Sequence, residues 1–348
     1  MPKKDWMVKQ ADLDDDQLHV FNAILNKSSI VSGCAGSGKS VLALIKAQRI
    51  QKERGDDYQI IVYTKALCGY MESGRETLGL KRDFDYYWWW KNRKGMPMAD
   101  YTIVDEIQDF TEEEIGEFIA ATRKHFFFFG DTAQSIYKPF KDTLPVEKIL
   151  YAFPDKQSST KTFELFRNYR LPIQVARIAQ SVGEDLPPFV ASIYKSNETQ
   201  KPFLLKYKND LDQIVTIGKT IKNRGLTDVG IFMPDNNAVE KLVNMFQKEN
   251  IDIEYRYSKD GTSYDTLSFD TDLPKVMTYH SAKGLQFETV FLPMIPAIIG
   301  NNRSALYVAM TRTYHFLYLM YSGVTPDLLA KAPSDCYETS TETIIQDK

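Results

Sequence analysis

Residues 33–40 read Gly-Cys-Ala-Gly-Ser-Gly-Lys-Ser and fit the phosphate-loop pattern G-x-x-x-x-G-K-S without a mismatch. Glycines let such a loop curl, so that successive backbone N–H groups point at phosphate oxygens. The lysine neutralises charge on the β- and γ-phosphates, and the hydroxyl after it is a ligand for Mg²⁺. The predicted phosphate site is therefore Gly33, Cys34, Ala35, Gly36, Ser37, Gly38, Lys39 and Ser40.

The sequence on either side of this loop fits the same interpretation. An apolar stretch, Ser29–Ser32, predicts a strand before it, and a helical pattern, Lys39–Lys52, follows it. The first turn of such a helix places positive partial charge beside the phosphates. A glycine-rich turn without a ligand is the alternative, and the two flanking patterns count against it.

A pair of adjacent acids is the second chemical signal. Asp105 and Glu106 directly follow the predicted strand Tyr101–Val104. Beside a phosphate loop, Asp105 would hold the magnesium ion, while Glu106 would orient and deprotonate the attacking water. The alternative is ordinary acidic capping at a helix start, since Asp109-Phe110-Thr111-Glu112 also resembles one.

Alternating strand and helix patterns must position these residues. Such alternation predicts α/β architecture with parallel sheets and helices on both faces. The expected strands are Ser29–Ser32, Gln59–Thr64, Tyr101–Val104, His125–Gly130, Phe203–Tyr207, Val229–Met233, Ile253–Tyr257, Val276–Tyr279, Val290–Pro293 and Phe316–Tyr321. The expected helices are Lys39–Lys52, Lys65–Leu78, Glu112–Thr122, Leu211–Lys222, Asn237–Glu249 and Asn302–Thr313.

A polar seam at Tyr151–Thr160, rich in Pro, Asp, Lys and Ser, predicts the division between two domains. We therefore expect an N-terminal domain over residues 1–155 and a C-terminal domain over residues 156–322. Residues 323–348 lose their periodicity, which predicts a mobile tail.

The composition excludes several classes of protein. The 348 residues carry a net charge of −3 and three cysteines without metal-ligand spacing, which argues against a disulfide framework. The N-terminus has no apolar signal core, and no apolar run approaches the roughly 20 residues of a membrane span. We expect a soluble, cytoplasmic protein that makes no membrane contact and binds any nucleic acid through a local groove.

Further strings occur in a fixed order along the chain. They are Leu13-Asp14-Asp15-Asp16-Gln17, Gly130-Asp131-Thr132-Ala133-Gln134-Ser135-Ile136-Tyr137, Asn168-Tyr169-Arg170, His280-Ser281-Ala282-Lys283-Gly284-Leu285-Gln286-Phe287 and Tyr307-Val308-Ala309-Met310-Thr311-Arg312. Together with the phosphate loop and the acid pair, the chain from Leu13 to Tyr321 resembles a superfamily-one helicase of the UvrD/Rep type. The resemblance implies two RecA-like domains with ATP and Mg²⁺ bound in the cleft between them.

The resemblance also assigns roles around the nucleotide. Gln17 would read the adenine edge with its amide, and Tyr169 would stack on the base. Gly284 and Gln286 belong to the string expected near the ribose, where Gln286 replaces an acidic residue of the family. Gln134 would sense the γ-phosphate.

The phosphate loop lies in the first half of the sequence, and the two arginines of the matched strings lie beyond the predicted domain boundary. By resemblance, Arg170 and Arg312 would both reach the γ-phosphate. A cation supplied from a second domain stabilises transition-state charge only when the cleft closes. ATP would thereby bias a hinge, and the hinge motion would be the mechanical output.

The expected nucleic-acid contacts depart in part from the family pattern. Lys138-Pro139-Phe140 replaces a family segment rich in Arg and Trp, and residues 86–94 read Tyr-Tyr-Trp-Trp-Trp-Lys-Asn-Arg-Lys. Aromatics followed by cations suit stacking on unpaired bases, but docking of a partner protein and core packing remain alternatives for this run. The candidate nucleic-acid contacts are Thr64, Tyr137, Phe140, Trp89 and His280.

Two other departures concern size and base recognition. Only about 35 residues separate Lys65 from Tyr101, and residues 257–275 are also short, so the large insertions of bigger family members are absent. Val41 stands where the family often has an arginine that covers the adenine.

The leading hypothesis is an ATP-driven translocase or helicase on single-stranded nucleic acid, with DNA and 3′-to-5′ movement favoured by the resemblance. The alternative is an ATP-gated interaction module that signals to a partner nuclease or effector. A kinase would leave Gln134 and Arg312 unexplained.

Overall fold

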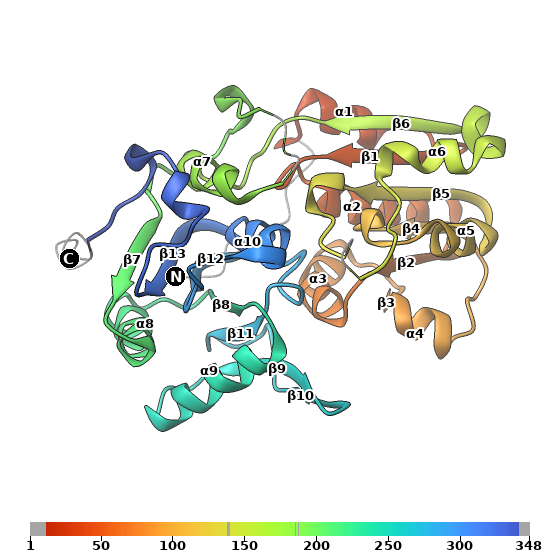
Figure 1. The fold of residues 1–348 in the computed structure, drawn as a ribbon. Coiled ribbons are helices and arrows are strands. Elements are labelled where there is room, and N and C mark those ends of the chain that lie inside the picture. The colour runs from red at the N-terminus through yellow and green to blue at the C-terminus, as the bar shows by residue number, and fades with distance from the viewer. Residues whose placement is uncertain (1–11, 138–139, 185, 187, 341–348) are drawn as a thin grey trace. The chain divides into compact units, whose positions relative to one another are not determined.

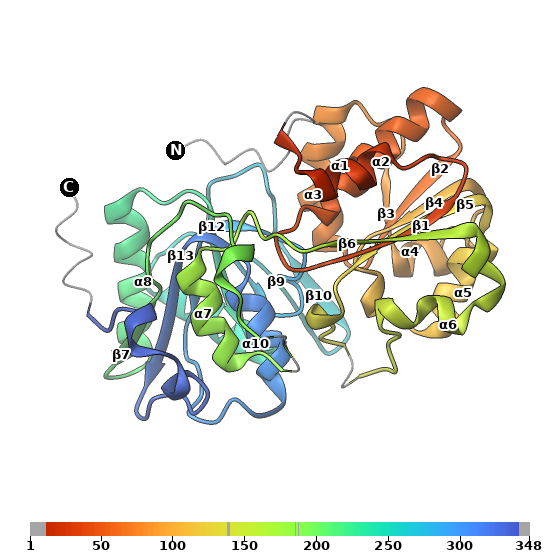
Figure 2. The same ribbon diagram turned by 90° about the horizontal axis from the view of Figure 1, so that it is seen from above.

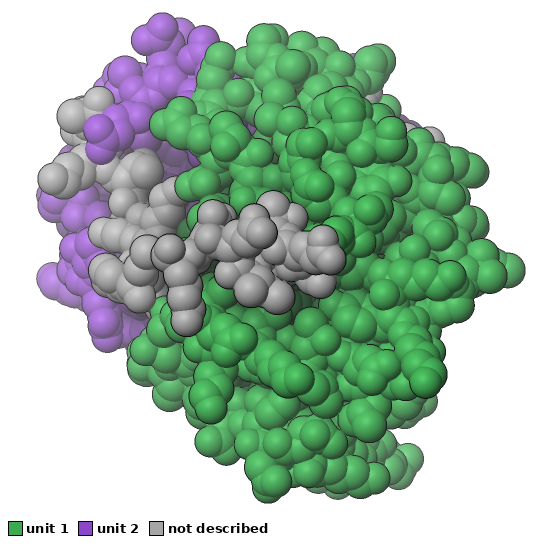
Figure 3. Space-filling view, turned by 90° about the vertical axis from the view of Figure 1, so that its left-hand side faces the viewer, with its two compact units in different colours: residues 1–4, 170–348 green, residues 5–169 purple. Residues whose placement is uncertain are grey.

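The computed structural model describes residues 12–137, 140–184, 186 and 188–340 (Figure 1). The chain forms two compact units that divide after Tyr169 (Figure 3). The described part of the N-terminal unit covers residues up to 169, and that of the C-terminal unit begins at Arg170.

The N-terminal unit is built on a parallel six-stranded sheet in the order β3-β2-β4-β5-β1-β6. Its strands are β1 (Ser28–Gly33), β2 (Tyr58–Val62), β3 (Phe84–Tyr86), β4 (Ala99–Val104), β5 (Thr122–Gly130) and β6 (Thr160–Leu165). Its helices are α1 (Asp15–Asn22), α2 (Lys39–Arg54), α3 (Lys65–Leu78), α4 (Tyr87–Asn92), α5 (Glu112–Ala120) and α6 (Ile149–Ala152).

Helices cover both faces of this sheet (Figure 2). Trp90 of α4, Phe118 of α5 and Ile149 of α6 share one apolar cluster with strand residues such as Phe128. Helices α1, α2 and α3 lie on the other face (Figure 2), where Lys46 of α2 stands over the ring of Phe127. Because the central strands are buried on both faces, they read as continuous apolar runs in the sequence.

The C-terminal unit holds a seven-stranded sheet in the order β10-β9-β11-β8-β12-β13-β7, parallel except for the β9–β10 pair. Its strands are β7 (Phe203–Tyr207), β8 (Val229–Met233), β9 (Glu254–Lys259), β10 (Thr262–Asp265), β11 (Lys275–Thr278), β12 (Phe287–Leu292) and β13 (Thr313–Ser322). Its helices are α7 (Ile173–Val182), α8 (Asp210–Arg224), α9 (Asn236–Lys248) and α10 (Arg303–Met310).

Helices α8 and α9 pack on one face of the second sheet through residues such as Ile217 and Phe246. Helices α7 and α10 pack against each other. The predicted α/β class with parallel sheets is confirmed in both units.

The structure divides the chain later than the expected boundary at residue 155. Residues 151–160, the predicted inter-domain seam, lead into β6, which pairs in parallel with β1 from Ser28 to Gly33. The polar segment is thus a connection inside the N-terminal unit, and the division falls after Tyr169.

The expected mobile tail is also corrected over its described part. Asp335 forms a two-pronged ion pair with Arg177 of α7, and Cys336 is buried. The amide of Leu204 in β7 donates to the carbonyl of Glu338 at 2.8 Å. Residues 323–340 therefore pack on their own unit, while the remainder of the predicted tail lies outside the described residues.

Some element bounds differ from the sequence-based expectation. The helix expected over Glu112–Thr122 ends at Ala120, because Thr122 already pairs with Ala99 as the first residue of β5. The sequence patterns do not predict β3, β6, β10, α1, α4, α6 or α7. None of the helices in the described ranges is long and apolar enough to cross a membrane.

Because Lys46 is buried, we expect the free energy of unfolding to change with pH in the alkaline range. Its ammonium donates to the carbonyls of Val20 and Ala23 at the end of α1, at 3.0 and 3.3 Å. Burial, followed by the nearby charge of Arg49, lowers the pKa of Lys46 to about 8. The folded state therefore releases this proton at a lower pH than the unfolded chain does.

We expect the free energy of unfolding of the wild type to rise by about 2 kcal/mol relative to Lys46→Met between pH 7.5 and 9.5. Over this range the unfolded chain still binds the proton that folded Lys46 has lost. Urea unfolding, followed by tryptophan fluorescence, measures this free energy. The signal comes from the part of the chain that contains Lys46, because all four tryptophans lie among residues 6–90. The exposed Lys52→Met is the control. A difference in free energy of unfolding between the wild type and Lys46→Met that does not change with pH would contradict the lowered pKa of Lys46.

Candidate functional site

The phosphate loop connects β1 to α2 at the carboxyl end of the sheet. Gly36 and Gly38 have φ angles of 72° and 88°, a region that favours glycine. A Cβ on Gly33 would lie 2.7 Å from Ser37 Oγ and 2.8 Å from Leu165 Cβ. Glycine at these positions is therefore required by the backbone path and by the close packing against β6.

Lys39 and Ser40 begin α2 and point back toward the sheet edge. Lys39 Nζ donates to the carbonyls of Gly33 and Cys34 at 2.8 and 2.9 Å, so its ammonium lies within the curl of the loop. Ser40 Oγ donates to Asp105 Oδ2 at 2.5 Å. The structure thus brings together the two predicted magnesium ligands, both hard oxygen donors of the kind that Mg²⁺ prefers.

The acid pair follows β4 and is buried. Burial and the neighbouring Glu106 carboxylate raise the pKa of Asp105, against the hydrogen bond from Ser40 and the charge of Lys39. Glu106 adopts a left-handed backbone conformation with φ of 58°. A non-glycine residue in this conformation costs of order 1–3 kcal/mol and is found mainly at functional sites. The alternative interpretation, simple acidic capping, does not explain the strain or the burial.

A chain of hydrogen bonds joins Glu106 to Gln134. Gln108 Nε2 donates to Glu106 Oε2, and Gln108 Oε1 accepts from the Asp131 amide at 2.8 Å. Gln134 Nε2 in turn donates to Asp131 Oδ2 at 2.6 Å. The proposed water-activating carboxylate and the proposed γ-phosphate sensor are therefore mechanically connected.

Sequence reasoning missed Gln108, which lies two residues after Glu106, and Asp131, which lies inside the string that begins at Gly130. The signal was the glycine before Asp131. A Cβ on Gly130 would lie 2.6 Å from Gln108 Oε1, so this glycine makes room for the amide that links the two loops.

The expected base-reading residues also gather in the N-terminal unit. Gln17 is buried, and its Nε2 donates to the carbonyl of Ser37 in the phosphate loop at 2.9 Å. The Tyr169 amide donates to the Gly36 carbonyl at 3.0 Å. Gln17 and Tyr169 are thus both fixed to the phosphate loop.

The two predicted arginines belong to the C-terminal unit and converge on one residue. Arg170 Nη2 donates to the Thr311 carbonyl and Arg312 Nη2 to the Thr311 hydroxyl, both at 3.0 Å. Arg312 Nε also donates to Val308 at the end of α10, at 2.9 Å. Residues separated by more than 140 positions in the sequence therefore form one guanidinium pair.

The remaining nucleotide candidates, Gly284 and Gln286, lie on the turns after β11 together with His280, a candidate nucleic-acid contact. His280 accepts a hydrogen bond from the Lys283 amide at 3.3 Å, and Gly284 has a φ angle of 80°. Gln286 directly precedes β12. Both ends of this segment are anchored in the sheet, which holds the string in a compact series of turns.

Three of the expected nucleic-acid contacts follow the strand ends of the N-terminal unit. The Thr64 hydroxyl caps α3 by accepting from the Leu67 amide at 3.2 Å. The rings of Tyr63 and Tyr137 are 4.4 Å apart, and Phe140 is 72% exposed. Thr64 therefore has a structural role as a cap, whereas most of the Phe140 side chain is exposed to solvent.

The aromatic run divides into an inner and an outer pair. Trp90 is buried and donates from Nε1 to Gln59 at 2.9 Å, and the Tyr87 hydroxyl donates to Glu117 at 3.1 Å. Trp88 and Trp89 are 50% and 43% exposed. Core packing thus explains the inner pair, and a binding role remains open for the outer pair.

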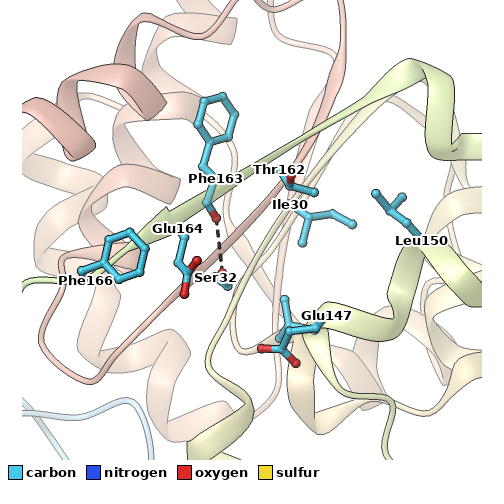
Figure 4. Close-up of a pocket in the computed structure, with 9 residues that line it drawn as sticks. Ile30, Ser32, Glu147, Leu150, Thr162, Phe163, Glu164 and Phe166 are labelled. Carbon is cyan, nitrogen blue, oxygen red and sulfur yellow. Dashed lines mark hydrogen bonds between the residues drawn. The ribbon is translucent and has the colours of Figure 1, made fainter. Parts of the chain in front are cut away.

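A pocket of about 520 Å³ lies beside the edge strand of the same unit (Figure 4). It is lined by Ile30, Ser32, Val146, Glu147, Leu150, Thr162, Phe163, Glu164 and Phe166. None of these residues belongs to the phosphate loop or to the chain that joins Glu106 to Gln134. The pocket nevertheless adjoins the candidate site, because Cys34 Sγ donates to the Phe166 carbonyl at 3.5 Å and the Thr132 hydroxyl donates to Glu147 at 2.7 Å.

Within the described ranges, no cluster of three or more His, Cys, Asp or Glu side chains could hold a metal ion.

Comparison with known proteins identifies relatives at the level of family. The chain is similar to a probable DNA helicase of Mycoplasma pneumoniae, 25% identical over 64% of this chain and 44% of the relative. It is also similar to the RecBCD enzyme subunit RecB of Chlamydia muridarum, 25% identical over 53% of this chain and 19% of the relative. The chain thus spans less than half the length of either curated relative.

Among solved structures, the arterivirus nonstructural protein 10 helicase is 15% identical, with a TM-score of 0.45 over 90% of this chain and 63% of that one. Residues 275–320 match the UvrD-like helicase C-terminal domain. Residues 29–218, more than half of the chain, match the viral superfamily 1 RNA helicase core domain. The chain therefore belongs to the superfamily 1 helicases, a family of nucleoside-triphosphate-hydrolysing enzymes.

Proposed function

We propose that the chain hydrolyses ATP and uses the energy to move along single-stranded nucleic acid. The observation that carries this proposal is the continuous path from Lys39 and Ser40, through Asp105 and Glu106, to Gln134. Such a path couples the phosphate loop to the residues that would respond to the γ-phosphate. DNA as the strand and 3′-to-5′ movement are supported by the family resemblance.

The residues of the N-terminal unit divide the chemistry among them. Lys39 and the loop amides would hold the β- and γ-phosphates, and Ser40 and Asp105 would hold Mg²⁺, which would neutralise charge on the phosphate oxygens. Glu106 accepts a proton from the attacking water, and Gln108 fixes the direction in which its carboxylate points. Gln134 would respond to the γ-phosphate, and its hydrogen bond to Asp131 would pass that response toward Gln108.

Arg170 and Arg312 would supply positive charge that opposes the charge developing on the transferred phosphoryl group. Their shared contact with Thr311 supports a joint role, because a shift of one guanidinium disturbs the hydrogen bonds of the other. Gly284 and Gln286 would complete the ribose side of the site.

Strand contacts are proposed at Thr64, Tyr137, Phe140, Trp89 and His280. The exposed rings of Phe140 and Trp89 suit stacking on unpaired bases, worth about 1–3 kcal/mol per base by alanine substitution. Thr64 would contribute through its backbone and its position at the strand end, since its hydroxyl caps α3.

An ATP-gated interaction module is the second candidate function, and α4 favours it. The short segment between α3 and β4 holds only β3 and α4, with Trp88 and Trp89 half exposed on its surface. In this reading the two rings would dock a partner protein in place of nucleic acid.

Variants of Glu106 and Lys39 give a first test of the proposed function, at the hydrolytic site. Glu106→Gln should lower kcat for ATP by about 10²- to 10⁴-fold while leaving ATP affinity within a few-fold, because only the proton acceptor is lost. Lys39→Ala should abolish both binding and turnover. Steady-state hydrolysis measures kcat, and equilibrium binding measures the affinity for ATP. The exposed Glu113→Gln is the control. Retained turnover in both variants would refute the site.

The second prediction tests the arginine pair. Arg170→Ala should lower kcat by about 10³-fold with little change in ATP affinity, since the cation acts on transition-state charge. Arg312→Lys should show a similar loss, because an ammonium does not reproduce the guanidinium geometry. The exposed Lys222→Ala is the control. An equal fall in binding and turnover would instead indicate general loss of structure.

The third prediction separates the two candidate functions. Single-stranded DNA should stimulate ATP hydrolysis, and Phe140→Ala and Trp89→Ala should each raise the DNA concentration for half-stimulation by about 5- to 100-fold. Tyr151→Ala, an 83% exposed ring on α6, should have no effect. Turnover unchanged by DNA and by RNA, with no strand binding at low salt, would favour the interaction module.

A further inference from the structure

Asp14 lies immediately before α1 and contacts two segments that are distant in the sequence. Its Oδ1 accepts from the Gln17 amide at 2.7 Å. Its Oδ2 lies 3.3 Å from Arg167 Nη1 and accepts a hydrogen bond from the Tyr169 hydroxyl. One carboxylate thus joins the start of α1 to the segment that follows β6.

On the α1 side, Asp14 and Ser37 fix the amide of Gln17. Gln17 Oε1 accepts from the Asp14 backbone amide at 3.1 Å, while Nε2 donates to the Ser37 carbonyl at 2.9 Å. An amide has two acceptor sites and two donors, so one of each remains for a ligand. A neighbouring acceptor and donor, as on the N7 and N6 edge of adenine, match that remainder.

On the other side, Asp14 holds the Tyr169 ring and the Arg167 guanidinium. The Tyr169 amide is fixed to Gly36, and its ring remains 38% exposed. The Arg167 side chain is 42% exposed. Val41 is buried and carries no charge. Arg167 interacts with both the Asp14 carboxylate and the Tyr169 hydroxyl, which places a cation beside Tyr169.

The charges favour an ionised carboxylate in this cluster. Burial alone would raise the pKa of Asp14, but hydrogen bonds from Gln17 and Tyr169 and the charge of Arg167 together lower it below the usual value. Burial and the Asp14 contact raise the pKa of Tyr169 to about 12, so the phenol remains a donor at neutral pH.

We propose that Asp14 is a positioning residue for the nucleotide base: it orients Gln17 along the base edge and holds Tyr169 and Arg167 against the base face. This inference rests on the proposed ATP hydrolysis. It adds that base selection depends on a residue that touches neither base nor phosphate. It also assigns to Arg167 the role of covering the adenine, which the family often gives to an arginine at the position of Val41.

A purely structural role is the competing explanation, because Asp14 also caps α1. Asparagine caps helices about as well as aspartate, so Asp14→Asn keeps the cap and removes the charge that holds Arg167. Tyr169→Phe keeps the stacking ring and removes only the hydroxyl. The exposed Asp15→Asn, one residue further along the same helix, is the matched control.

The experiment compares a nucleotide with a phosphate chain that carries no base. Affinities for ATP, GTP, CTP and inorganic tripolyphosphate are measured by competition against a fluorescent nucleotide, together with KM and kcat for ATP. Asp14→Asn should weaken ATP binding and raise KM about tenfold, leave kcat within about twofold, and leave tripolyphosphate affinity unchanged. The ratio of ATP to CTP affinity should fall by the same factor.

Tyr169→Phe should reproduce part of this loss, and the double variant should lose less than the sum of the two, because both remove one contact. Thermal unfolding of Asp14→Asn should match that of Asp15→Asn. An Asp14→Asn protein with unchanged base preference, or with equal losses for ATP and tripolyphosphate, overturns the inference. A wild type that neither binds nor hydrolyses ATP would instead refute the proposed function.

Discussion

The parallel pairing of β1, β5 and β4 is the constraint on which the candidate site depends. In this register Ser32 lies beside Gly130, and Phe128 lies beside Val104. The loops that follow these strands therefore leave the sheet at the same edge. The hydrogen bond from Ser40 to Asp105 and the amide of Gln108 between Glu106 and Asp131 are possible only because of this alignment. A shift in register would separate the phosphate loop from its acids.

The elements around the phosphate loop could be predicted because each has a strong local signal. Lys65–Leu78 begins and ends at the residues expected, since Thr64 caps its start and Gly79 ends it in a left-handed conformation. Edge elements lack such signals. β6 reads Thr-Lys-Thr-Phe-Glu-Leu, and only one side of it is paired, so its polar residues resemble a linker. The expected domain boundary fell early for this reason.

The sequence predicts the residues of the site whose type and motif indicate their chemistry, but not the residues that connect them. Lys39, Ser40, Asp105 and Glu106 follow from the motifs alone, but the motifs do not state which side chains connect them. Gln108 occupies a neutral position between two acids in the sequence, and only the fold brings the Asp131 amide to its carbonyl oxygen. The aromatic run shows the same limit. Trp90 is buried and Trp89 is exposed, although the two are the same residue type side by side in the sequence. The sequence of the run does not show which of its rings will face the core.

The docked segment before residue 340 has a consequence for the second sheet. β7 is an outer strand, and Glu338 forms an isolated parallel bridge with Phe203 along it. Exposed outer strands are templates for association between chains, and proteins commonly shield them with short pieces of backbone. The ion pair between Arg177 and Asp335 holds this covering segment in place. A chain shortened after Gly323 would bare the β7 backbone and favour self-association, even though every residue of the candidate nucleotide site would remain.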